Sequence, residues 1–478
     1  MTMESRALLW FRQDLRLHDN EALWDALNHA EKVIPVYVFD ERLYGGKTRY
    51  GFPKIDHHRR LFIMQSVLNL KKNLQDKGSN LIIRIGKPEE ELFELARHLK
   101  VSWICCNRER TAEEVNVQET LEKKLWTIGL EIRYNRGKML YYTQDLPFPI
   151  YHTPETFTQY KKEVDRIVPI RTPLPTPQHI PWISEPVDPG KLPDLGINNT
   201  DSAHIDIENQ LFKGGEDKAL ERLNYFFWQT DGLSHYKHTR NDLLGSDYSS
   251  RFSPWLAQGC LSPKRIYHEL KCFESEHGAS EHTYAFYLEL LWRDYFRLNG
   301  KKYGNALFLK GGLKGKPNKI LKDDLELFKS WATGLTGIPM IDANMNELNQ
   351  TGFMSNRGRQ LVASFLVKDL EINWQMGAEY FESKLIDYDP CSNWGNWNYI
   401  AGVGNDPRED RYFNILTQSK RYDPEGLYVR RWLPQLAHLP SSIVHCPDGM
   451  NDIDQQKYGL VLGVDYPLPQ INTERWIV

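Results

Sequence analysis

The chain has 478 residues, of which 41% are hydrophobic, 12% aromatic and 26% charged, with a formal net charge of -3. This composition is globular and excludes disordered, collagen-like and coiled-coil proteins, and the length predicts more than one domain. The longest apolar runs, residues 33–39 and 81–85, are far shorter than the roughly 20 residues of a membrane span. No secretory signal opens the chain, so we expect a cytoplasmic protein. The six cysteines include no CxxC pair and predict neither a disulfide framework nor a zinc site.

Short apolar runs alternate with amphipathic stretches over the first 135 residues. Strands are predicted at residues 7–11, 33–39, 81–86, 101–106 and 130–134, and helices at 21–31, 59–77, 89–99 and 112–128. This order predicts an α/β domain with a parallel, Rossmann-like sheet covered by helices on both faces. Ligands bind such sheets at the carboxyl ends of the strands, so residues 107–110 (Asn-Arg-Glu-Arg) are a candidate small-molecule site. The alternative is a solvated charged loop.

Eight prolines fall between Pro169 and Pro193, which excludes a helix or a central strand there. We interpret this segment as part of a long interdomain connector. After about Glu216 the apolar residues follow helical spacing. The predicted organisation is an α/β domain over residues 1–140, a proline-rich linker over 141–215 and a larger all-α domain over 216–478.

The basic residues are unevenly distributed. Nine Lys or Arg lie between Arg293 and Lys322, where Asp294 is the only acidic residue. Such a segment predicts a basic face for a polyanionic partner, and the alternative is an ordinary solvated, Lys-rich loop.

The segment from Tyr236 to Pro254 (YKHTRNDLLGSDYSSRFSP) is rich in hydroxyl groups. Ser253 suits a helix N-cap and Pro254 the first helical position. With Arg251 and the neighbouring serines, a helix start of this kind predicts a phosphate cradle. The alternative is a plain capped helix.

Three later segments place polar and aromatic residues on one helical face at spacings of three and four. A helical core has no need of such groups, because burying them unpaired costs about 1 to 3 kcal/mol each. The three sets are Glu289, Trp292 and Arg293; Asn356, Arg359 and Gln360; and Asp389, Asn393 and Trp397.

Several long motifs resemble the photolyase and cryptochrome family, and within it they are most similar to DASH-type cryptochromes. They are LLWFRQDLRLHDN, YKHTRNDLLGSDYSSRFSPWLAQGCLSP, ELLWRDYF, MSNRGRQLVASFLVKDL and LIDYDPCSNWGNWNYIAGVGNDPREDRYFN. The resemblance covers almost the whole chain. It implies an α/β antenna-binding domain followed by a helical, catalytic FAD-binding domain.

The resemblance also implies roles for individual residues. Serines and Arg251 would hold the FAD phosphates, Arg359 would pair with Asp387 beside the flavin, and Asn393 would face flavin N5 and favour reduced flavin. The implied FAD-binding residues are Tyr236, Ser249, Ser250, Arg251, Phe252, Ser253, Trp292, Arg293, Arg359, Asp387, Tyr388, Asp389 and Asn393. The implied pocket for two flipped-out bases and the DNA contacts comprise Arg240, Glu289, Trp292, Asn356, Arg357, Gln360 and Tyr399, with the basic segment after Arg293.

Three departures from the family pattern refine this expectation. Tyr399 and Gln360 stand where duplex-repairing photolyases usually have Trp and Met, which resembles the DASH branch and favours single-stranded substrates. No His lies between Phe353 and Gln360, which disfavours (6-4) repair. Trp397 and Trp374 match the inner two positions of the family's electron-transfer chain, but the outer position aligns with Leu321.

The implied activity is that of a deoxyribodipyrimidine photo-lyase. Excited reduced FAD would donate an electron that splits cyclobutane pyrimidine dimers, preferentially in single-stranded DNA, with Glu289, Asn393, Trp397 and Trp374 as catalytic residues and no metal. Glu109 resembles the pterin-contacting residue of folate-binding members, so 5,10-methenyltetrahydrofolate is the candidate antenna. We expect a monomer. The alternative function is a blue-light sensory flavoprotein that binds nucleic acid or a partner without repair.

Overall fold

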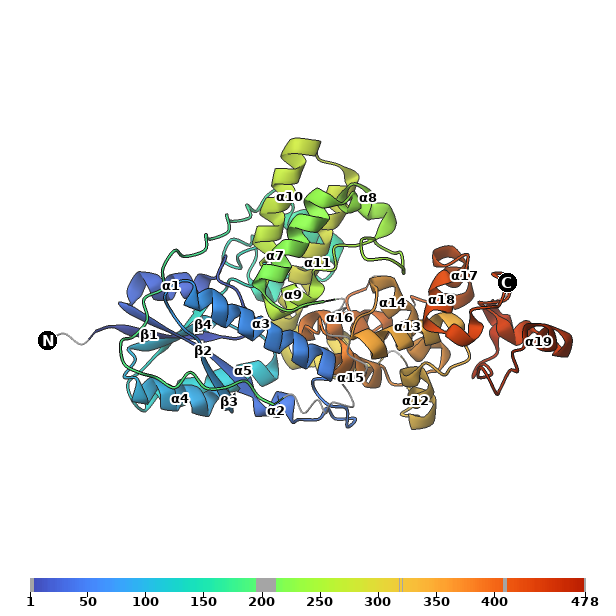
Figure 1. Cartoon of the computed structure of the whole chain (residues 1–478), viewed down its shortest axis with the longest axis horizontal. Coiled ribbons are helices and arrows are strands. Elements are labelled where there is room, and N and C mark those ends of the chain that lie inside the picture. Colours follow the sequence, from blue (N-terminus) through green and yellow to red (C-terminus); the bar gives the residue numbers. More distant parts are fainter. Residues whose placement is uncertain (1–3, 195–211, 318, 320, 407–410, 477–478) are drawn as a thin grey trace. The chain divides into compact units, whose positions relative to one another are not determined.

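The computed structural model describes residues 4–194, 212–317, 319, 321–406 and 411–476. The chain, drawn in Figure 1, folds into two compact units, each assembled from separated segments. The first unit comprises Met1–Ser234, Ser250–Asn305 and Asp387–Ser392, and the second comprises His235–Ser249, Ala306–Ile386 and Asn393–Val478. The contiguous domain boundaries near residues 140 and 215 stay a prediction.

The first unit contains a five-stranded parallel sheet in the order β3-β2-β1-β4-β5. Its strands are β1 (Arg6–Phe11), β2 (Lys32–Asp40), β3 (Ile82–Gly86), β4 (Trp103–Asn107) and β5 (Ile132–Asn135). Every strand overlaps a predicted one. The predicted Rossmann-like α/β architecture is therefore confirmed.

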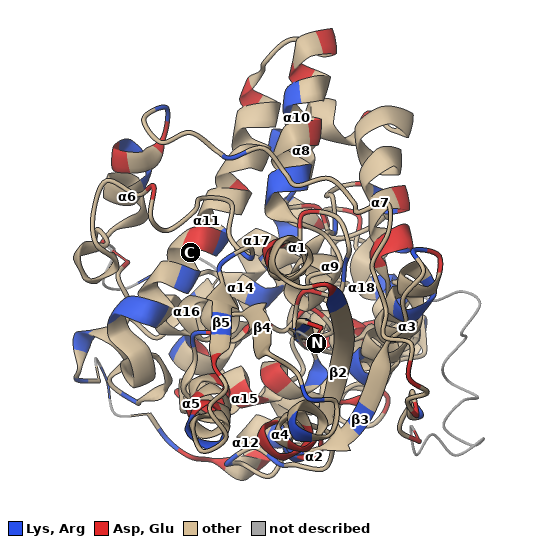
Figure 2. Cartoon of the chain, turned by 90° about the vertical axis from the view of Figure 1, so that its left-hand side faces the viewer, with Lys and Arg blue, Asp and Glu red and all other residues tan. Residues whose placement is uncertain are grey.

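Helices cover both faces of the sheet, as predicted. On one side lie α1 and α3, and on the other α4 and α5 (Figure 1), the latter two carrying interspersed acidic and basic residues (Figure 2). Their bounds are α1 (Glu21–His29), α3 (His57–Gln75), α4 (Pro88–His98) and α5 (Ala112–Trp126).

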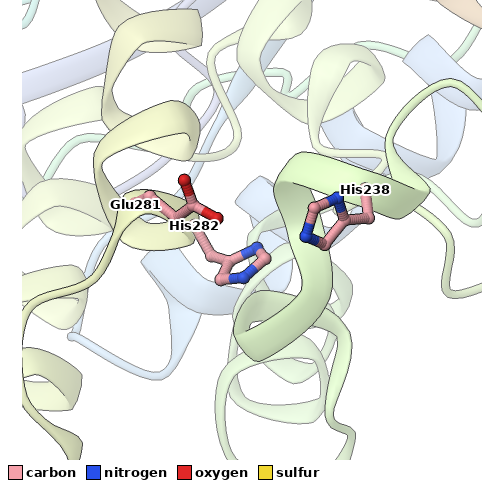
Figure 3. A group of neighbouring side chains, drawn as sticks. All are labelled: His238, Glu281 and His282. Carbon is pink, nitrogen blue, oxygen red and sulfur yellow. The ribbon is translucent and has the colours of Figure 1, made fainter.

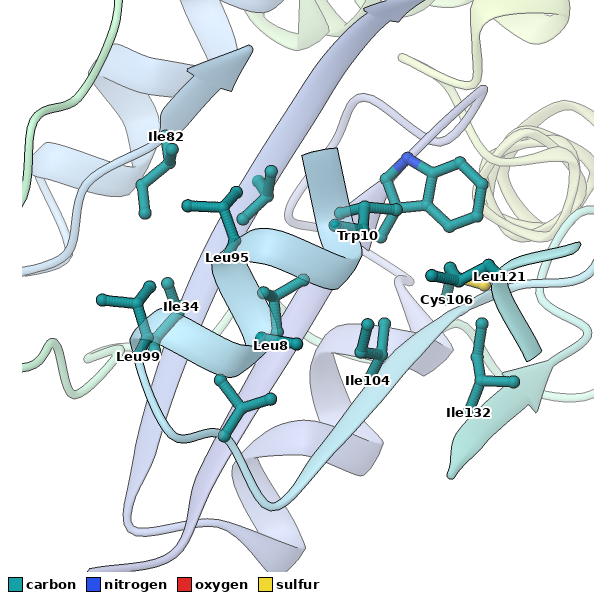
Figure 4. Packing of buried hydrophobic residues seen from close by; sticks show 14 of the residues in the cluster. Leu8, Trp10, Ile34, Ile82, Leu95, Leu99, Ile104, Cys106, Leu121 and Ile132 are labelled. Carbon is teal, nitrogen blue, oxygen red and sulfur yellow. The ribbon is translucent and has the colours of Figure 1, made fainter. Parts of the chain in front are cut away.

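The core between the sheet and the pair α4 and α5 is built from alternate strand residues. Leu8, Ile34 and Ile104 point toward Leu95 and Leu121 (Figure 4). Strand side chains alternate between the two faces, and helix side chains recur every three or four residues, so these apolar positions meet in one layer. Burial of this layer supplies the main stabilisation of the unit.

The proline-rich segment is neither helix nor strand, as predicted, and it packs within the first unit. The Pro181 carbonyl accepts from the Val33 amide at 2.9 Å, and the Pro189 carbonyl accepts from the Ile83 amide at 2.7 Å. Ile183 is buried in the sheet core. Prolines keep their carbonyl acceptors, so the segment can satisfy amides along the sheet without forming a strand.

The remaining described elements of the first unit are helical. The longest, α11, begins with a capping box between Ser280 and Thr283. These elements are α2 (Glu41–Tyr44), α6 (Phe157–Val164), α7 (Glu216–Asn224), the π-helix Tyr225–Gln229, α9 (Ser253–Gln258), α10 (Pro263–His277) and α11 (Glu281–Tyr303).

Helices are the regular secondary structure of the described residues of the second unit, apart from isolated bridges, which confirms the predicted α domain. Its helices are α12 (Leu325–Thr333), α13 (Pro339–Thr351), α14 (Asn356–Ser364), the π-helix Phe365–Asp369, α15 (Trp374–Lys384), α17 (Ile415–Tyr422), α18 (Leu427–Trp432) and α19 (Asp452–Tyr458). Two α-helices, α8 (Gly232–Thr239) and α16 (Pro390–Ile400), and the 3-10 helix Gly304–Phe308 include residues of both units. Among the described helices, none combines the length and the apolar character of a membrane span.

A buried carboxylate joins α7 to the loop after β1 within the first unit. Glu216 accepts from the backbone amides of Leu17 at 2.8 Å and His18 at 3.0 Å, and it lies 2.5 Å from His18 Nδ1. Burial by itself would raise the pKa of Glu216, but the hydrogen bonds and charge of His18 lower it below the ordinary value. The ionised form is thus the one that the fold stabilises.

We predict that Glu216→Ala lowers the free energy of unfolding by about 3 kcal/mol, because it leaves buried donors without an acceptor. The folded-state pKa is depressed, so this contribution is present above the unfolded pKa of about 4.3 and is lost as pH falls through the folded value. Urea unfolding at pH 7 and at decreasing pH measures both effects. The exposed Glu221→Ala on the same helix is the control, and equal losses in the two variants would contradict the assignment.

Candidate functional site

The phosphate cradle predicted from the sequence contains a strained residue. Arg251 is buried and has a φ of 55°, a left-handed conformation that residues with a side chain rarely adopt. The preceding carbonyl, that of Ser250, accepts from Arg222 Nε at 3.1 Å. Such strain persists where surrounding contacts impose it, and it concentrates at functional sites.

Helix α9, which follows the cradle, begins one residue earlier than predicted. Phe252 occupies the cap position and Ser253 is the first helical residue, so the assignment of Ser253 as N-cap is wrong. The sequence favours Ser at a cap, but the backbone turns helical before Pro254 supplies its fixed φ. Phe252 makes no side-chain cap bond, so no cap side chain satisfies the first amides of α9.

The predicted face of α11 includes a rigid aromatic platform. Trp292 stacks on Phe157 of α6 with ring centroids 3.6 Å apart and planes 8° apart. Glu289, one turn earlier, is half-buried. Arg293 donates to the carbonyls of Lys138 at 2.7 Å and Leu256 at 3.3 Å, and burial, followed by the neighbouring Arg297, lowers its pKa.

A chain of buried charges crosses the first unit. Glu109 pairs with Lys138 and lies 3.4 Å from Arg297, whose other nitrogen is 2.9 Å from Asp389. Burial would raise the pKa of Glu109 and of Asp389, but the neighbouring cations lower both below their ordinary values. Asp389 also accepts from the Ser392 amide at 2.8 Å in the first turn of α16.

The structure shows that part of the segment predicted as a basic face is turned inward. Arg297 is buried and forms ion pairs within the first unit, and Arg293 binds backbone carbonyls. Lys319 pairs with Glu371 at 2.5 Å. Counting charges in the sequence could not distinguish buried from exposed basic residues. Helix α11 is amphipathic and turns some of its basic residues inward.

In the second unit, Asn393 and Trp397 lie one turn apart on α16. The Asn393 side-chain nitrogen donates to the Ala378 carbonyl at 3.0 Å, which fixes the orientation of the amide. Trp397 is buried against Trp331 and Phe381, with centroids 6.3 and 5.2 Å away. The side-chain oxygen of Asn393 is thereby oriented as an acceptor.

Trp374 begins α15 and is also buried. Its ring lies edge-on to Trp394 with centroids 5.7 Å apart, and its indole nitrogen donates to the Lys310 carbonyl at 3.3 Å. Leu321 is half-buried and directly precedes Lys322, which forms a bridge with Ile372, two residues before Trp374. This bridge brings Leu321, the outer position of the predicted electron-transfer chain, near the segment that contains Trp374.

Helix α14 presents the next predicted set. Asn356 is exposed, whereas Arg359 and Gln360 are half-buried, as is Tyr399 on α16. Arg359 donates to the Met354 carbonyl at 2.9 Å. The predicted pair of Arg359 with Asp387 joins residues of different units and stays a prediction.

A basic cluster surrounds Arg357 in the second unit. Arg357 donates to Asn241 at 3.2 Å, and its guanidinium lies 4.8 Å from the Tyr422 ring. Burial lowers its pKa, with further lowering from Arg421 and Arg240. The sequence indicated Arg240 and Arg357 but missed Arg421, because 64 positions separate it from Arg357 and no motif carries it.

Three residues able to ligate metals lie outside the predicted site (Figure 3). His238 is near the end of α8, and Glu281 and His282 open α11. His238 belongs to one compact unit and the other two residues to the other. No metal centre is assigned to them.

Comparison with known proteins identifies related chains over nearly the full length. Residues 7–178 match the family model described as DNA photolyase, and residues 286–476 match the FAD binding domain of DNA photolyase. A protein named cryptochrome DASH from Gloeobacter violaceus is 47% identical over 97% of this chain and 93% of its own length.

Two solved structures are also similar. The crystal structure of a cryptochrome from Synechocystis sp. has a TM-score of 0.93 and 44% identity, over 100% of this chain and 99% of that one. A class III photolyase from Agrobacterium tumefaciens has a TM-score of 0.85 and 29% identity, over 100% of this chain and 97% of that one.

The residues present fit the FAD that these matches imply. The strained Arg251 and the amides that open α9 offer cation and N–H donors of the kind that hold phosphates. The anchored amide of Asn393 offers an oriented acceptor.

We predict that Gly377→Ala destabilises the protein by about 3 kcal/mol through overpacking. A β-carbon at Gly377 would overlap the Trp397 ring and lie 2.7 Å from Leu366. Gly449→Ala is the control, because a β-carbon there meets nothing within 4 Å. Thermal melting compares the two variants, and wild-type stability in Gly377→Ala would show that the Trp397 packing is looser than described.

Proposed function

The chain belongs to the photolyase and cryptochrome family, in its DASH branch, and from this membership we propose that it is a light-driven lyase that repairs cyclobutane pyrimidine dimers, preferentially in single-stranded DNA. FAD is the cofactor of the family domain that residues 286–476 match. The assignment of individual residues below belongs to the proposal.

One observation supports repair above all: the platform of Trp292 and Phe157 beside Glu289 on α11. Stacking fixes the indole plane, and a fixed aromatic plane binds flipped-out bases through their faces. Glu289, one turn away, supplies a carboxyl group that would hydrogen-bond the dimer and steady the charge that develops on it. Asn356, Gln360 and Tyr399 would complete the pocket.

The cofactor would be held by the residues carried over from the family motifs. Arg251, with the serines around it, would bind the phosphates, and Asn393 would accept a hydrogen bond at flavin N5. Asp389 is fixed by Arg297 and would contact the ribityl and ring region from a defined position. When bound, FAD supplies the light-excited electron donor for splitting the dimer.

DNA binding would use the cluster of Arg240, Arg357 and Arg421. Guanidinium groups neutralise phosphates, and this term provides affinity without sequence preference. Tyr399 and Gln360 make the base pocket smaller and more polar than Trp and Met would. Such a pocket yields less energy for extracting a dimer from a duplex, which supports the preference for single strands.

The antenna, the location and the oligomeric state are also proposals. Glu109 would mark the 5,10-methenyltetrahydrofolate site, although its carboxylate is already paired with Lys138 and Arg297, so neighbouring groups would make most of the contacts. We retain the cytoplasm as location and the monomer as state, both expected from the sequence.

The second candidate is a blue-light sensory flavoprotein. It is favoured by the name cryptochrome, which the relatives from Gloeobacter violaceus and Synechocystis sp. carry. Both candidates use FAD, Asn393 and a basic surface. Illumination of the protein with dimer-containing single-stranded and duplex oligonucleotides distinguishes the two candidates. If thymine is recovered from neither substrate, the lyase is excluded.

We predict that Glu289→Ala lowers the repair rate by about 10²-fold while FAD stays bound, because a group that stabilises developing charge is lost. Glu289→Gln, which retains hydrogen bonding, is expected to retain more activity than Glu289→Ala. Repair rates and flavin absorbance measure the two properties. The exposed Glu276→Ala is the control, and unchanged repair in Glu289→Ala would remove Glu289 from the site.

We predict that Trp397→Phe abolishes light-driven reduction of FAD by an external thiol, because Trp397 would supply the electron. Repair is expected to survive when the FAD is reduced chemically beforehand. Leu321→Trp is expected to speed photoreduction by adding an outer donor near Trp374. Steady-state absorbance under blue light measures these rates. Normal photoreduction in Trp397→Phe would refute the proposed electron-transfer chain. No gain in Leu321→Trp would indicate that another route already connects Trp374 with solvent.

A further inference from the structure

A row of aromatic side chains extends from the platform of Trp292 and Phe157 into the core of the first unit. Trp292 lies edge-on to Tyr295, with ring centroids 6.0 Å apart. Tyr295 in turn lies 5.3 Å from Tyr160 of α6. Both tyrosines are fully buried, whereas Trp292 is half-buried. Solvent therefore reaches the row at the platform, and the row continues inward through neighbouring rings.

Two phenols that share a hydrogen bond continue the row. The hydroxyl groups of Tyr141 and Tyr287 are 2.7 Å apart. The Tyr141 hydroxyl also donates to the Val164 carbonyl at 3.5 Å, one helical turn after Tyr160 on α6. Asp294 of α11 accepts from the Tyr141 amide at 2.8 Å. These contacts hold Tyr141 against both α6 and α11.

The far end of the row is a phenol bonded to a carboxylate. Tyr287 lies 6.0 Å from Tyr284, which precedes it by one turn of α11. The Tyr284 hydroxyl donates to Asp165 at 2.7 Å. Tyr284 and Asp165 are half-buried, so solvent reaches this end as well. Six residues form what we call the tyrosine row: Trp292, Tyr295, Tyr160, Tyr141, Tyr287 and Tyr284.

Packing alone does not account for the hydroxyl groups of the tyrosine row. Among the described residues, the Tyr160 hydroxyl is buried without a hydrogen-bond partner, which costs about 1 to 3 kcal/mol and which phenylalanine would avoid. Burial is the main cause that raises the pKa of Tyr141, Tyr160 and Tyr287, so these phenols stay protonated. Closely spaced neutral phenols are suited to passing single electrons, because electron tunnelling slows exponentially with distance.

We propose that the tyrosine row returns an electron to Trp292 when this residue is oxidised, and so protects the platform. A one-electron oxidant, such as an oxidised nucleobase or a small inorganic radical, takes one electron from Trp292 and leaves an indole radical cation. Tyr284 supplies the replacing electron through the intervening phenols and loses its hydroxyl proton to the Asp165 carboxylate. The products are neutral Trp292, a neutral Tyr284 phenoxyl radical and protonated Asp165, so charge and electrons balance.

The carboxylate of Asp165 makes Tyr284 the end of the row that is oxidised. A phenol loses an electron more readily when a base takes its proton at the same time. Tyr141 and Tyr295 donate to backbone carbonyls, which take up no proton. A soluble thiolate then gives one electron to the Tyr284 radical, the proton returns from Asp165, and two sulfur radicals combine to a disulfide. The row does not depend on the proposed repair activity, since no step passes through FAD or a dimer.

The test uses pulse radiolysis of the full-length, FAD-loaded protein with azide radicals, which oxidise indoles in preference to phenols. Indole and phenoxyl radicals absorb at different wavelengths, so transfer between them is followed directly. In the wild type, part of the indole signal is expected to convert to phenoxyl at a rate independent of protein concentration. Trp292→Phe, Tyr295→Phe and Tyr287→Phe are each expected to lose this conversion, because each removes a redox-active member of the row.

Asp165→Asn distinguishes the relay from ordinary packing. Asparagine can still accept the Tyr284 hydrogen bond but takes up no proton. The phenoxyl yield is therefore expected to fall while the melting temperature stays at the wild-type value. The control variants are Trp126→Phe and Tyr151→Phe, at exposed positions of the same unit outside the row, and both are expected to retain the conversion.

Peptide mass spectrometry after prolonged exposure to the oxidant provides a second measurement. Tyr287→Phe is expected to accumulate more oxidised Trp292 than the wild type, because the electron no longer returns. Equal Trp292 oxidation in the two proteins, unchanged conversion in Trp292→Phe, or a wild-type phenoxyl yield in Asp165→Asn would overturn the proposal. A conversion rate that rises with protein concentration would also overturn it, by assigning the transfer to collisions between molecules.

Discussion

The buried ion pairs of Arg297 hold three separate segments of the first unit together. A guanidinium is placed deep in the protein only when its charge is compensated, and here Glu109 and Asp389, which are far apart in the sequence, compensate it. The pairs join the loop after β4, the middle of α11 and the start of α16. Breaking one partner would leave an unmatched buried charge, which typically costs 3 to 5 kcal/mol.

One of these pairs also positions the start of α16 within the first unit. Asp389 is held by Arg297 and accepts from the first turn of α16, so the start of this helix has a fixed position within the first unit. Asn393 and Trp397 follow on the same helix, and in the second unit they pack against Ala378 and Gly377.

The sequence predicts the sheet well because local patterns determine it. Apolar runs and amphipathic spacing locate all five strands and the four helices around them. Contacts between distant segments are not encoded in local spacing, so the platform of Phe157 under Trp292, the inward turn of Arg297 and the packing of Ile183 were not predicted. The start of α9 was predicted one residue too late, because cap preference and proline geometry both favour a helix that begins at Pro254, whereas the backbone is already helical at Ser253. Arg421 was not predicted, because it lies outside the motifs recognised in the sequence.

The interleaving of the two units along the chain has a consequence for biosynthesis. The segment Asp387–Ser392 completes the first unit, although most of that unit is made before residue 305. While the intervening residues are being synthesised, Arg297 has Glu109 as a partner but lacks Asp389. The sheet can assemble early from its own apolar residues. The ion pairs of Arg297 are complete only after residue 389 has left the ribosome. Neither unit corresponds to a continuous fragment, so the protein matures as a whole chain rather than domain by domain.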